Sequence, residues 1–219
     1  MIAQRIPPEA PTRVMSVRGG LKLRLLPADD ETPPSNLDRG RFFFAAVLPW
    51  VALYTLTAAL HLTGVAFRFA FEDQLPVYAW TALIYQSIYP AVAVAPWQAR
   101  TRGDLRRLMM SLWTAMAVVF PIYWIMPSQA PRRPLELDHW IAQLLQFERT
   151  ACPPAEAFPS FHVLWAIFLA RLWRPAWLGI LYAAAIAVSC IATGMHYIPD
   201  ILAALAVAPF LVARRHTYR

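Results

Sequence analysis

The chain has 219 residues, of which 58% are hydrophobic and only 15% are charged, and its formal net charge is +7. A soluble domain of this length would carry more charge, so the composition argues against a soluble protein and indicates a membrane protein. The basic residues gather in short segments between apolar runs, which is typical of membrane topology and unlike a groove that follows nucleic acid.

The first forty residues are polar and rich in proline and arginine. We expect residues 1–40 to form a cytoplasmic, largely disordered tail, in which residues 17–26 could lie on a lipid surface. No cleavable signal peptide is expected, so the first apolar run would act as its own insertion signal. Residues 41–215 would then form a membrane domain.

Six apolar runs in this domain predict six membrane spans. We expect them at residues 42–67, 76–97, 108–126, 158–174, 176–193 and 198–212. The fourth run is short, starting within 158–160 and ending within 171–174, so it should be central in the bundle or lie where the membrane thins. The predicted fold is therefore an all-α integral membrane protein, a bundle of six transmembrane helices.

Two stretches have polar residues that this bundle must place. The second span has Tyr85, Gln86, Ser87 and Tyr89 in its middle, which should face other helices, either as hydrogen-bonding partners or as the wall of a substrate pocket. The connection 127–158 has apolar side chains at helical spacing between residues 137 and 147, opposite polar ones. This pattern predicts an amphipathic helix on the bilayer surface.

The distribution of Lys and Arg predicts the orientation. The tail and the second, fourth and last connections hold 16 of these residues, and the alternate connections hold the other four. Positive charge stays in the cytoplasm, so both termini should be cytoplasmic in a multi-pass protein of the cell membrane. His162 starts the fourth span and His196 precedes the sixth, so both should lie on the extracytoplasmic side.

His196 and Asp200 are four residues apart, so the carboxylate can reach the imidazole and leave its second nitrogen available to attack. His162 could donate a proton to a leaving oxygen and later activate water or an acceptor hydroxyl. Pro159 and Ser160 at a helix start offer an anion site. Each residue alone could be structural, and a histidine and aspartate at this spacing could bind metal, but no further ligand shares their face. Cys152 and Cys190 are expected to be free thiols.

The sequence Phe-Pro-Ser-Phe-His, followed after two spans by His-Tyr-Ile-Pro-Asp, resembles the type 2 phosphatidic acid phosphatase superfamily. Phe161 occupies a position where the phosphatases have Gly, which is similar to the inositol phosphorylceramide synthase and sphingomyelin synthase branch. The resemblance implies that His196 is the nucleophile, that Asp200 orients it, and that His162 is the general acid.

Two phosphate-binding cations of the family pattern are missing. An Arg six residues before the nucleophile is replaced by Cys190, and a Lys of the first motif is replaced by Met126. That motif survives only as Arg133-Pro134, so Arg132 and Arg133 are the nearest substitutes for binding phosphate. Their alternative role is that of a basic pair beside lipid headgroups.

These residues predict a lipid phosphatase or lipid phosphotransferase that acts through a phosphohistidine at the extracytoplasmic face. It would bind a membrane lipid substrate at Ser160, Phe161, Arg132 and Arg133, and would need no metal, other cofactor or nucleic acid. The alternative is a catalytically silent membrane protein that binds a lipid or a partner through the same pocket, which Cys190 and Met126 would favour.

Overall fold

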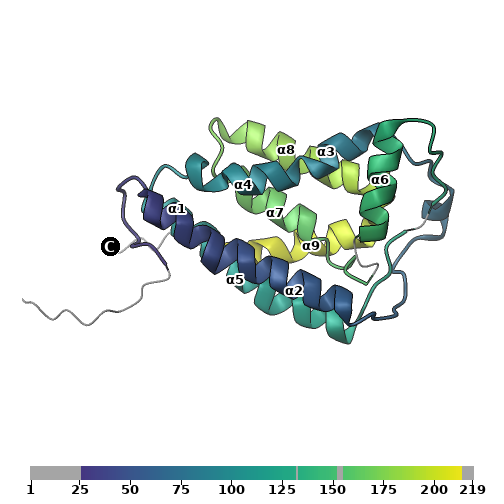
Figure 1. The fold of residues 1–219 in the computed structure, drawn as a ribbon, viewed down its shortest axis with the longest axis horizontal. Helices are drawn as coiled ribbons and strands as arrows, with labels where there is room; N and C mark the ends of the chain where they lie inside the picture. The colour runs from purple at the N-terminus through teal and green to yellow at the C-terminus, as the bar shows by residue number, and fades with distance from the viewer. Residues whose placement is uncertain (1–25, 132, 152–154, 214–219) are drawn as a thin grey trace, which may run out of the picture.

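The computed structural model describes residues 26–131, 133–151 and 155–213. Most of the expected tail, Arg132 and Cys152 lie outside this part of the chain. The fold is all-α (Figure 1). Its elements are α1 (Asn36–Phe42), the π-helical η1 (Phe43–Val47), α2 (Leu48–Ala59), the 3₁₀ turns η2 (Ala70–Gln74) and η3 (Ala79–Thr81), α3 (Ala82–Gln86), α4 (Ile88–Gln98), α5 (Arg102–Ile125), α6 (Trp140–Ala151), α7 (Phe161–Ala170), α8 (Ala176–Ala192) and α9 (Ile198–Leu211).

The first apolar helix differs from its expected bounds at both ends. It runs from Asn36 to Ala59 through α1, η1 and α2, and it starts early because Ser35 and Asp38 form a capping box. It stops early because the chain then runs extended against the end of α5. There Val65 N donates to Pro127 O at 3.2 Å. A side chain on Gly64 would collide with that carbonyl, so only glycine fits.

Within the described ranges, two helices are long and apolar enough to cross a membrane, Asn36–Ala59 and α5. Each has 24 residues, which corresponds to about 36 Å of helix. The helices α7, α8 and α9 are apolar but shorter. The expected second span is broken into η3, α3 and α4, with Ser87 at the break donating its hydroxyl to Ile84 O at 2.6 Å. Six spans therefore remain a prediction.

The short helix α7 is central in the bundle, which is one of the two placements expected from its length. It packs against α4, α5, α8 and α9. Seven of its ten residues are buried: Phe161, Val163, Leu164, Trp165, Ala166, Phe168 and Leu169. Its first turn, which contains His162, thus opens into the interior of the bundle.

The helix α6 lies across one end of the bundle (Figure 1). It packs against η3 and α3, burying Ala142, Leu145 and Glu148, while Trp140 and Phe147 on its other side are exposed. The amphipathic helix predicted from the sequence is present, and its inner face closes the bundle. Its placement on a bilayer surface stays a prediction.

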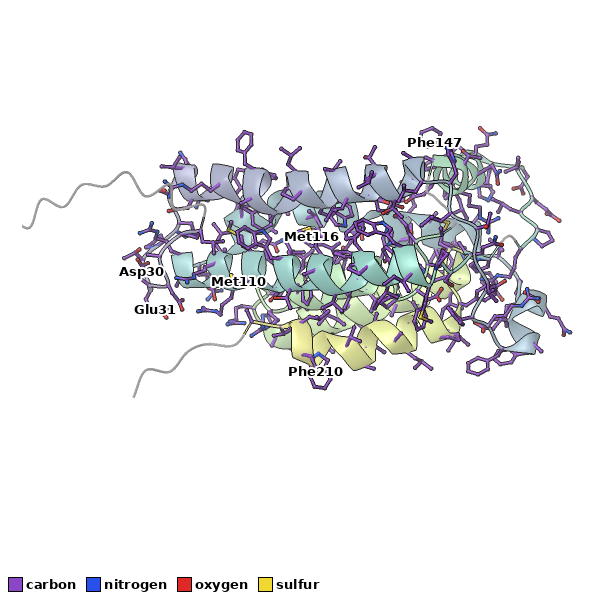
Figure 2. All side chains as sticks on the ribbon, turned by 90° about the horizontal axis from the view of Figure 1, so that it is seen from below. Asp30, Glu31, Met110, Met116, Phe147 and Phe210 are labelled. Atoms are coloured by element: carbon purple, nitrogen blue, oxygen red, sulfur yellow. The ribbon has the colours of Figure 1, made fainter. Side chains whose placement is uncertain are left out.

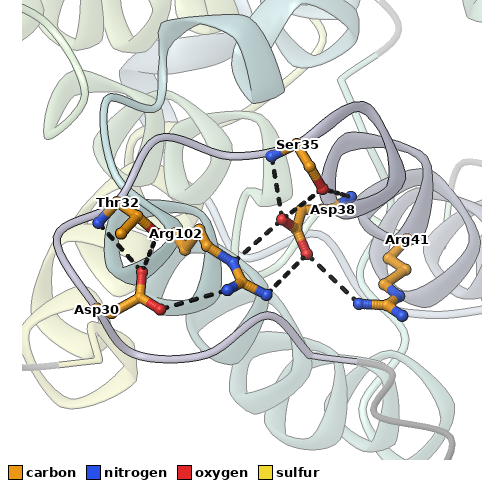
Figure 3. A network of polar contacts seen from close by, with 6 residues as sticks. All are labelled: Asp30, Thr32, Ser35, Asp38, Arg41 and Arg102. Atoms are coloured by element: carbon orange, nitrogen blue, oxygen red, sulfur yellow. Dashed lines mark hydrogen bonds and ion pairs between the residues drawn. The ribbon is translucent and has the colours of Figure 1, made fainter.

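The start of α1 and the end of α9 lie at the opposite end of the bundle (Figure 1). A network of ion pairs there ties the segment before α1 to α5 (Figure 3). Arg102 lies 3.3 Å from Asp30 and 3.1 Å from Asp38, and Asp38 is 2% exposed. Residues 36–40 are therefore helical and held in place, and do not belong to the disordered tail expected from the sequence.

The outer surface of the bundle carries many large apolar side chains. Figure 2 shows Phe147 and Phe210 pointing away from the helices, with Met116 inside. Phe210 is 83% exposed and Ile125 is 79% exposed. A soluble monomer rarely shows so much apolar surface, so this exterior fits a lipid environment.

Candidate active site

His196 lies in the turn that leads into α9, and Asp200 lies in the first turn of that helix. The His196 Nδ1 is 3.3 Å from Asp200 Oδ2 and 3.1 Å from the carbonyl oxygen of Ala157. Because both partners are acceptors, we assign the proton to Nδ1, which leaves a lone pair on Nε2. The pairing predicted from the sequence is present, and it spans a turn and a helix start.

The two sequence motifs are joined by contacts between the loop before α7 and the start of α9. Ser160 N donates to the backbone oxygen of Asp200 at 3.1 Å. The Ser160 hydroxyl, which is fully buried, lies 3.1 Å from His196 Nε2 and caps α7 by accepting from Val163 N. The Ser160 hydroxyl, which was expected to bind an anion, is therefore within hydrogen-bond distance of the unprotonated nitrogen of His196.

His162 faces His196 across the site. Their ring centroids are 5.8 Å apart. The hydroxyl of Tyr85 lies 3.2 Å from His162 Nδ1, and that of Tyr89 lies 3.3 Å from Nε2. Two of the polar residues from the second apolar run thus face the bundle, as predicted, and they contact a histidine of the site.

Two guanidinium groups lie beside these histidines. Arg133 donates to the carbonyl oxygens of Leu75, at 3.1 Å, and Ile191. Arg149, on α6, donates to the carbonyl oxygens of Arg133 at 2.9 Å and Thr193 at 2.7 Å. Neither makes an ion pair within the described part of the chain.

Both arginines are packed against the backbone of Gly194, which has a φ of +67°. A Cβ atom there would lie 2.7 Å from Arg149 Nη2 and 3.2 Å from Arg133 Nε. Burial lowers the pKa of both guanidiniums, and the charge of Arg133 lowers that of Arg149 further. Both still carry their charge at neutral pH. Two adjacent positive charges, one buried and one partly buried, that make no ion pair with the described residues favour binding of an anion.

The histidines and arginines line one cavity of about 260 Å³. Its remaining walls are largely apolar and aromatic, and they include Trp50, Tyr54, Ile88, Val92, Phe161 and Trp165. Glu156 also lines it, and burial raises the pKa of its carboxyl to about 9, although the nearby hydroxyls of Thr57 and Tyr54 lower it in part. The cavity thus has a cationic end and an apolar wall.

The structure brings together His162, His196, Asp200, Ser160, Phe161 and Arg133 of the residues predicted from the sequence. Arg132 lies outside the described residues. Met126 directly follows α5 as its C-cap residue and is half exposed, while Cys190 is a buried free thiol. Within the ranges described, no three His, Cys, Asp or Glu side chains form a group that could hold a metal.

Arg149 and Glu148 are site residues that the sequence reasoning missed. Both come from α6, and Glu148 accepts from the Tyr89 hydroxyl at 2.5 Å. The amphipathic pattern of residues 137–147 predicts a helix on the bilayer surface, and it stops just before these two residues. Their adjacent opposite charges, directly after the pattern, were the available signal.

A family model described as the PAP2 superfamily matches residues 51–213. This match covers both histidine motifs and most of the described chain. The comparisons with curated proteins and with solved structures gave no significant match.

Proposed function

Because this chain belongs to the PAP2 superfamily, we propose that it is an integral membrane lipid phosphatase or lipid phosphotransferase acting through a phosphohistidine on His196. The observation that carries the proposal is the convergence of three groups on one cavity. These are a histidine with an unprotonated Nε2, which a buried carboxylate orients from behind, a second histidine, and a pair of arginines. Such a set matches nucleophilic transfer of a phosphoryl group.

The first half of the reaction uses His196 and the cationic end of the cavity. A phosphate ester binds between Arg133 and Arg149, which neutralise its charge. The Ser160 hydroxyl turns from His196 Nε2 to a phosphate oxygen, which exposes the nitrogen lone pair. His196 Nε2 then forms a bond to phosphorus as the ester P–O bond breaks, and His162 gives its proton to the leaving oxygen.

The second half reverses these roles. His162, now neutral, takes a proton from the incoming water or alcohol, whose oxygen attacks phosphorus as the P–N bond breaks. Water gives a phosphatase, and a lipid alcohol gives a headgroup transferase. Asp200 stabilises the positive charge on His196 while the phosphohistidine exists.

The apolar wall of the cavity and the apolar exterior support a lipid as the substrate. An aromatic cluster beside the histidines consists of Trp50, Phe161 and Trp165. The ring centroid of Trp50 lies 6.1 Å from that of Phe161 and 5.6 Å from that of Trp165. An acyl or isoprenyl chain could lie on this wall while its phosphate reaches the arginines.

We further propose six spans with both termini in the cytoplasm and the site at the extracytoplasmic face. The distribution of positive charge supports this orientation. A topology reporter fused after residue 145 tests it: an extracytoplasmic signal is expected, and a cytoplasmic one would overturn the orientation.

The activity is tested with the purified full-length protein in lipid nanodiscs. Phosphatidic acid, an isoprenyl diphosphate, and a phospholipid together with diacylglycerol or ceramide are offered as labelled substrates, with His196→Ala as the control. Release of free phosphate identifies a phosphatase, and a newly labelled lipid identifies a transferase. If no substrate yields either product, the result would contradict an enzymatic function and favour the alternative of a catalytically silent lipid-binding protein.

A further inference from the structure

We propose that Glu148 and Tyr89 form a relay that stabilises the protonated state of His162. In this relay the Glu148 carboxylate acts on the imidazole through the Tyr89 hydroxyl. Both are positioning residues, and the relay rests on the proposed role of His162 as acid and base. It would serve His162 as Asp200 serves His196, although it comes from other elements, α4 and α6.

The hydrogen bonds between His162, Tyr89 and Glu148 all run in one direction, from the imidazole to the carboxylate. The Tyr89 hydroxyl donates to Glu148 Oε1 at 2.5 Å, a distance typical of a hydroxyl bound to a carboxylate. Its single proton is then used, so the same oxygen can only accept from His162, whose Nε2 lies 3.3 Å away. The contacts therefore place a proton on Nε2 and a negative charge one hydroxyl beyond it.

This arrangement assigns different tasks to the two nitrogens of His162. Nε2 stays bonded to Tyr89, and Nδ1 is left to exchange a proton with the substrate. Nδ1 now contacts the hydroxyl of Tyr85, whose ring is stacked on the imidazole at 4.3 Å. In the first half-reaction the Nδ1 proton passes to the leaving oxygen, and in the second Nδ1 takes the proton of the attacking water or alcohol.

The position of Glu148 supports a role beyond holding α6 in place. It is 7% exposed, and a buried carboxylate is costly unless it is well paired. An apolar side chain would hold α6 against the bundle at less cost. A carboxylate near an imidazolium favours the charged form of the histidine.

Other groups also act on His162, and the test must separate them. Those that face it are Tyr85 from α3, Tyr89 from α4, Glu148 from α6 and His196 from the turn before α9, and Arg133, Arg149 and Glu156 line the same cavity. The two arginines and a protonated His196 disfavour a positive charge on His162, so the carboxylate offsets their effect.

The relay is tested with Glu148→Gln, which keeps the size of the side chain and removes its charge. The pH profile of kcat/KM is measured on the substrate found for the wild-type protein. Without the carboxylate, His162 loses its proton more easily, so the alkaline limb should move to lower pH by about one unit. Glu136→Gln, on an exposed glutamate outside the cavity, is the matched control and should leave the profile unchanged.

Tyr89→Phe removes only the linking hydroxyl and should move the limb in the same direction. The double variant should shift no further than the larger single shift, because both changes break one path. Additive shifts would show that Glu148 acts without Tyr89. An unshifted limb in a folded Glu148→Gln protein with reduced activity would assign Glu148 a structural role and overturn the relay.

A second measurement needs no substrate, so it separates the relay from the proposed function. Titration of ¹⁵N-labelled histidines by NMR, assigned with His162→Gln, reports the protonation of His162 directly. A midpoint that falls in Glu148→Gln supports the relay even if no lipid is turned over. A midpoint that stays unchanged in both Glu148→Gln and Tyr89→Phe contradicts it.

Discussion

Asp200 holds His196 from within the first turn of α9, with Oδ2 3.3 Å from the imidazole Nδ1. The same oxygen accepts from Tyr197 N at 2.8 Å, so one carboxylate orients the nucleophile and caps the helix. Helix geometry and imidazole geometry are therefore fixed together. This dual role explains why Asp200 is fully buried.

Asp200→Asn should lower kcat by roughly 10³- to 10⁴-fold, because an amide cannot stabilise the imidazolium and can favour the wrong tautomer. The cap is weakened as well, at a cost of about 1 kcal/mol in unfolding free energy. Kinetics and thermal unfolding on the same preparation check both effects. A variant that unfolds earlier but keeps wild-type kcat would show that Asp200 is only a helix cap.

Arg149→Gln should lower kcat/KM by roughly 10- to 100-fold, because it removes a charge-assisted contact with the substrate phosphate. Arg149→Lys should recover part of this loss, since it keeps the charge but not the paired donors. The measurement is steady-state kinetics together with inhibition by inorganic phosphate. Unchanged kinetics and phosphate inhibition in Arg149→Gln would exclude this arginine from the phosphate site.

Gly194→Ala should disturb the arginine pair without removing either charge. The added methyl group would lie 2.7 Å from Arg149 Nη2, and the left-handed backbone conformation costs about 1–2 kcal/mol for a residue with a Cβ atom. We expect a higher KM for the phosphate ester and a lower melting temperature. A variant with a wild-type KM would show that the guanidiniums can move aside without losing the substrate.

Glu156 should make stability depend on pH. Its pKa is raised from 4.5 to about 9 by burial, so above pH 4.5 the folded protein holds a proton that the unfolded chain has released. Stability should therefore fall as the pH rises from about 4.5 towards 9, by at most about 1.4 kcal/mol per pH unit.

Glu156→Gln cannot ionise, so its stability should decline less over this pH range. The check is the melting temperature of the two proteins at pH 5, 7 and 9 in the same nanodiscs. The difference between them should grow with pH in favour of the variant. Parallel curves would show that Glu156 is already ionised at neutral pH.

The sequence could predict the pairing of His196 with Asp200 because it is local: four residues, a proline and a helix start determine it. Bringing His162 to the same place needed the length and number of the helices between them, which hydropathy supplies. The capping box formed by Ser35 and Asp38 is also visible in the sequence as a Ser followed three residues later by an Asp. This pattern predicts the start of the first helix correctly.

Arg149 and Glu148 could not be placed from periodicity, because an amphipathic pattern does not say which neighbour each face meets. Glu148 is buried and Arg149 reaches the cavity only because α6 packs against α3 and η3. The early end of α2 depends on a long-range contact between Gly64 and Pro127. Such contacts leave no local signal, so hydropathy extended the helix to residue 67.

The most direct test of the central claim is to locate the phosphoryl group during turnover. The purified protein is mixed with substrate labelled in its phosphate, quenched at alkaline pH to preserve the acid-labile P–N bond, digested and mapped by mass spectrometry. Label on His196, absent from His196→Ala, is the predicted result. Label on His162, or turnover with no labelled histidine, would contradict the mechanism.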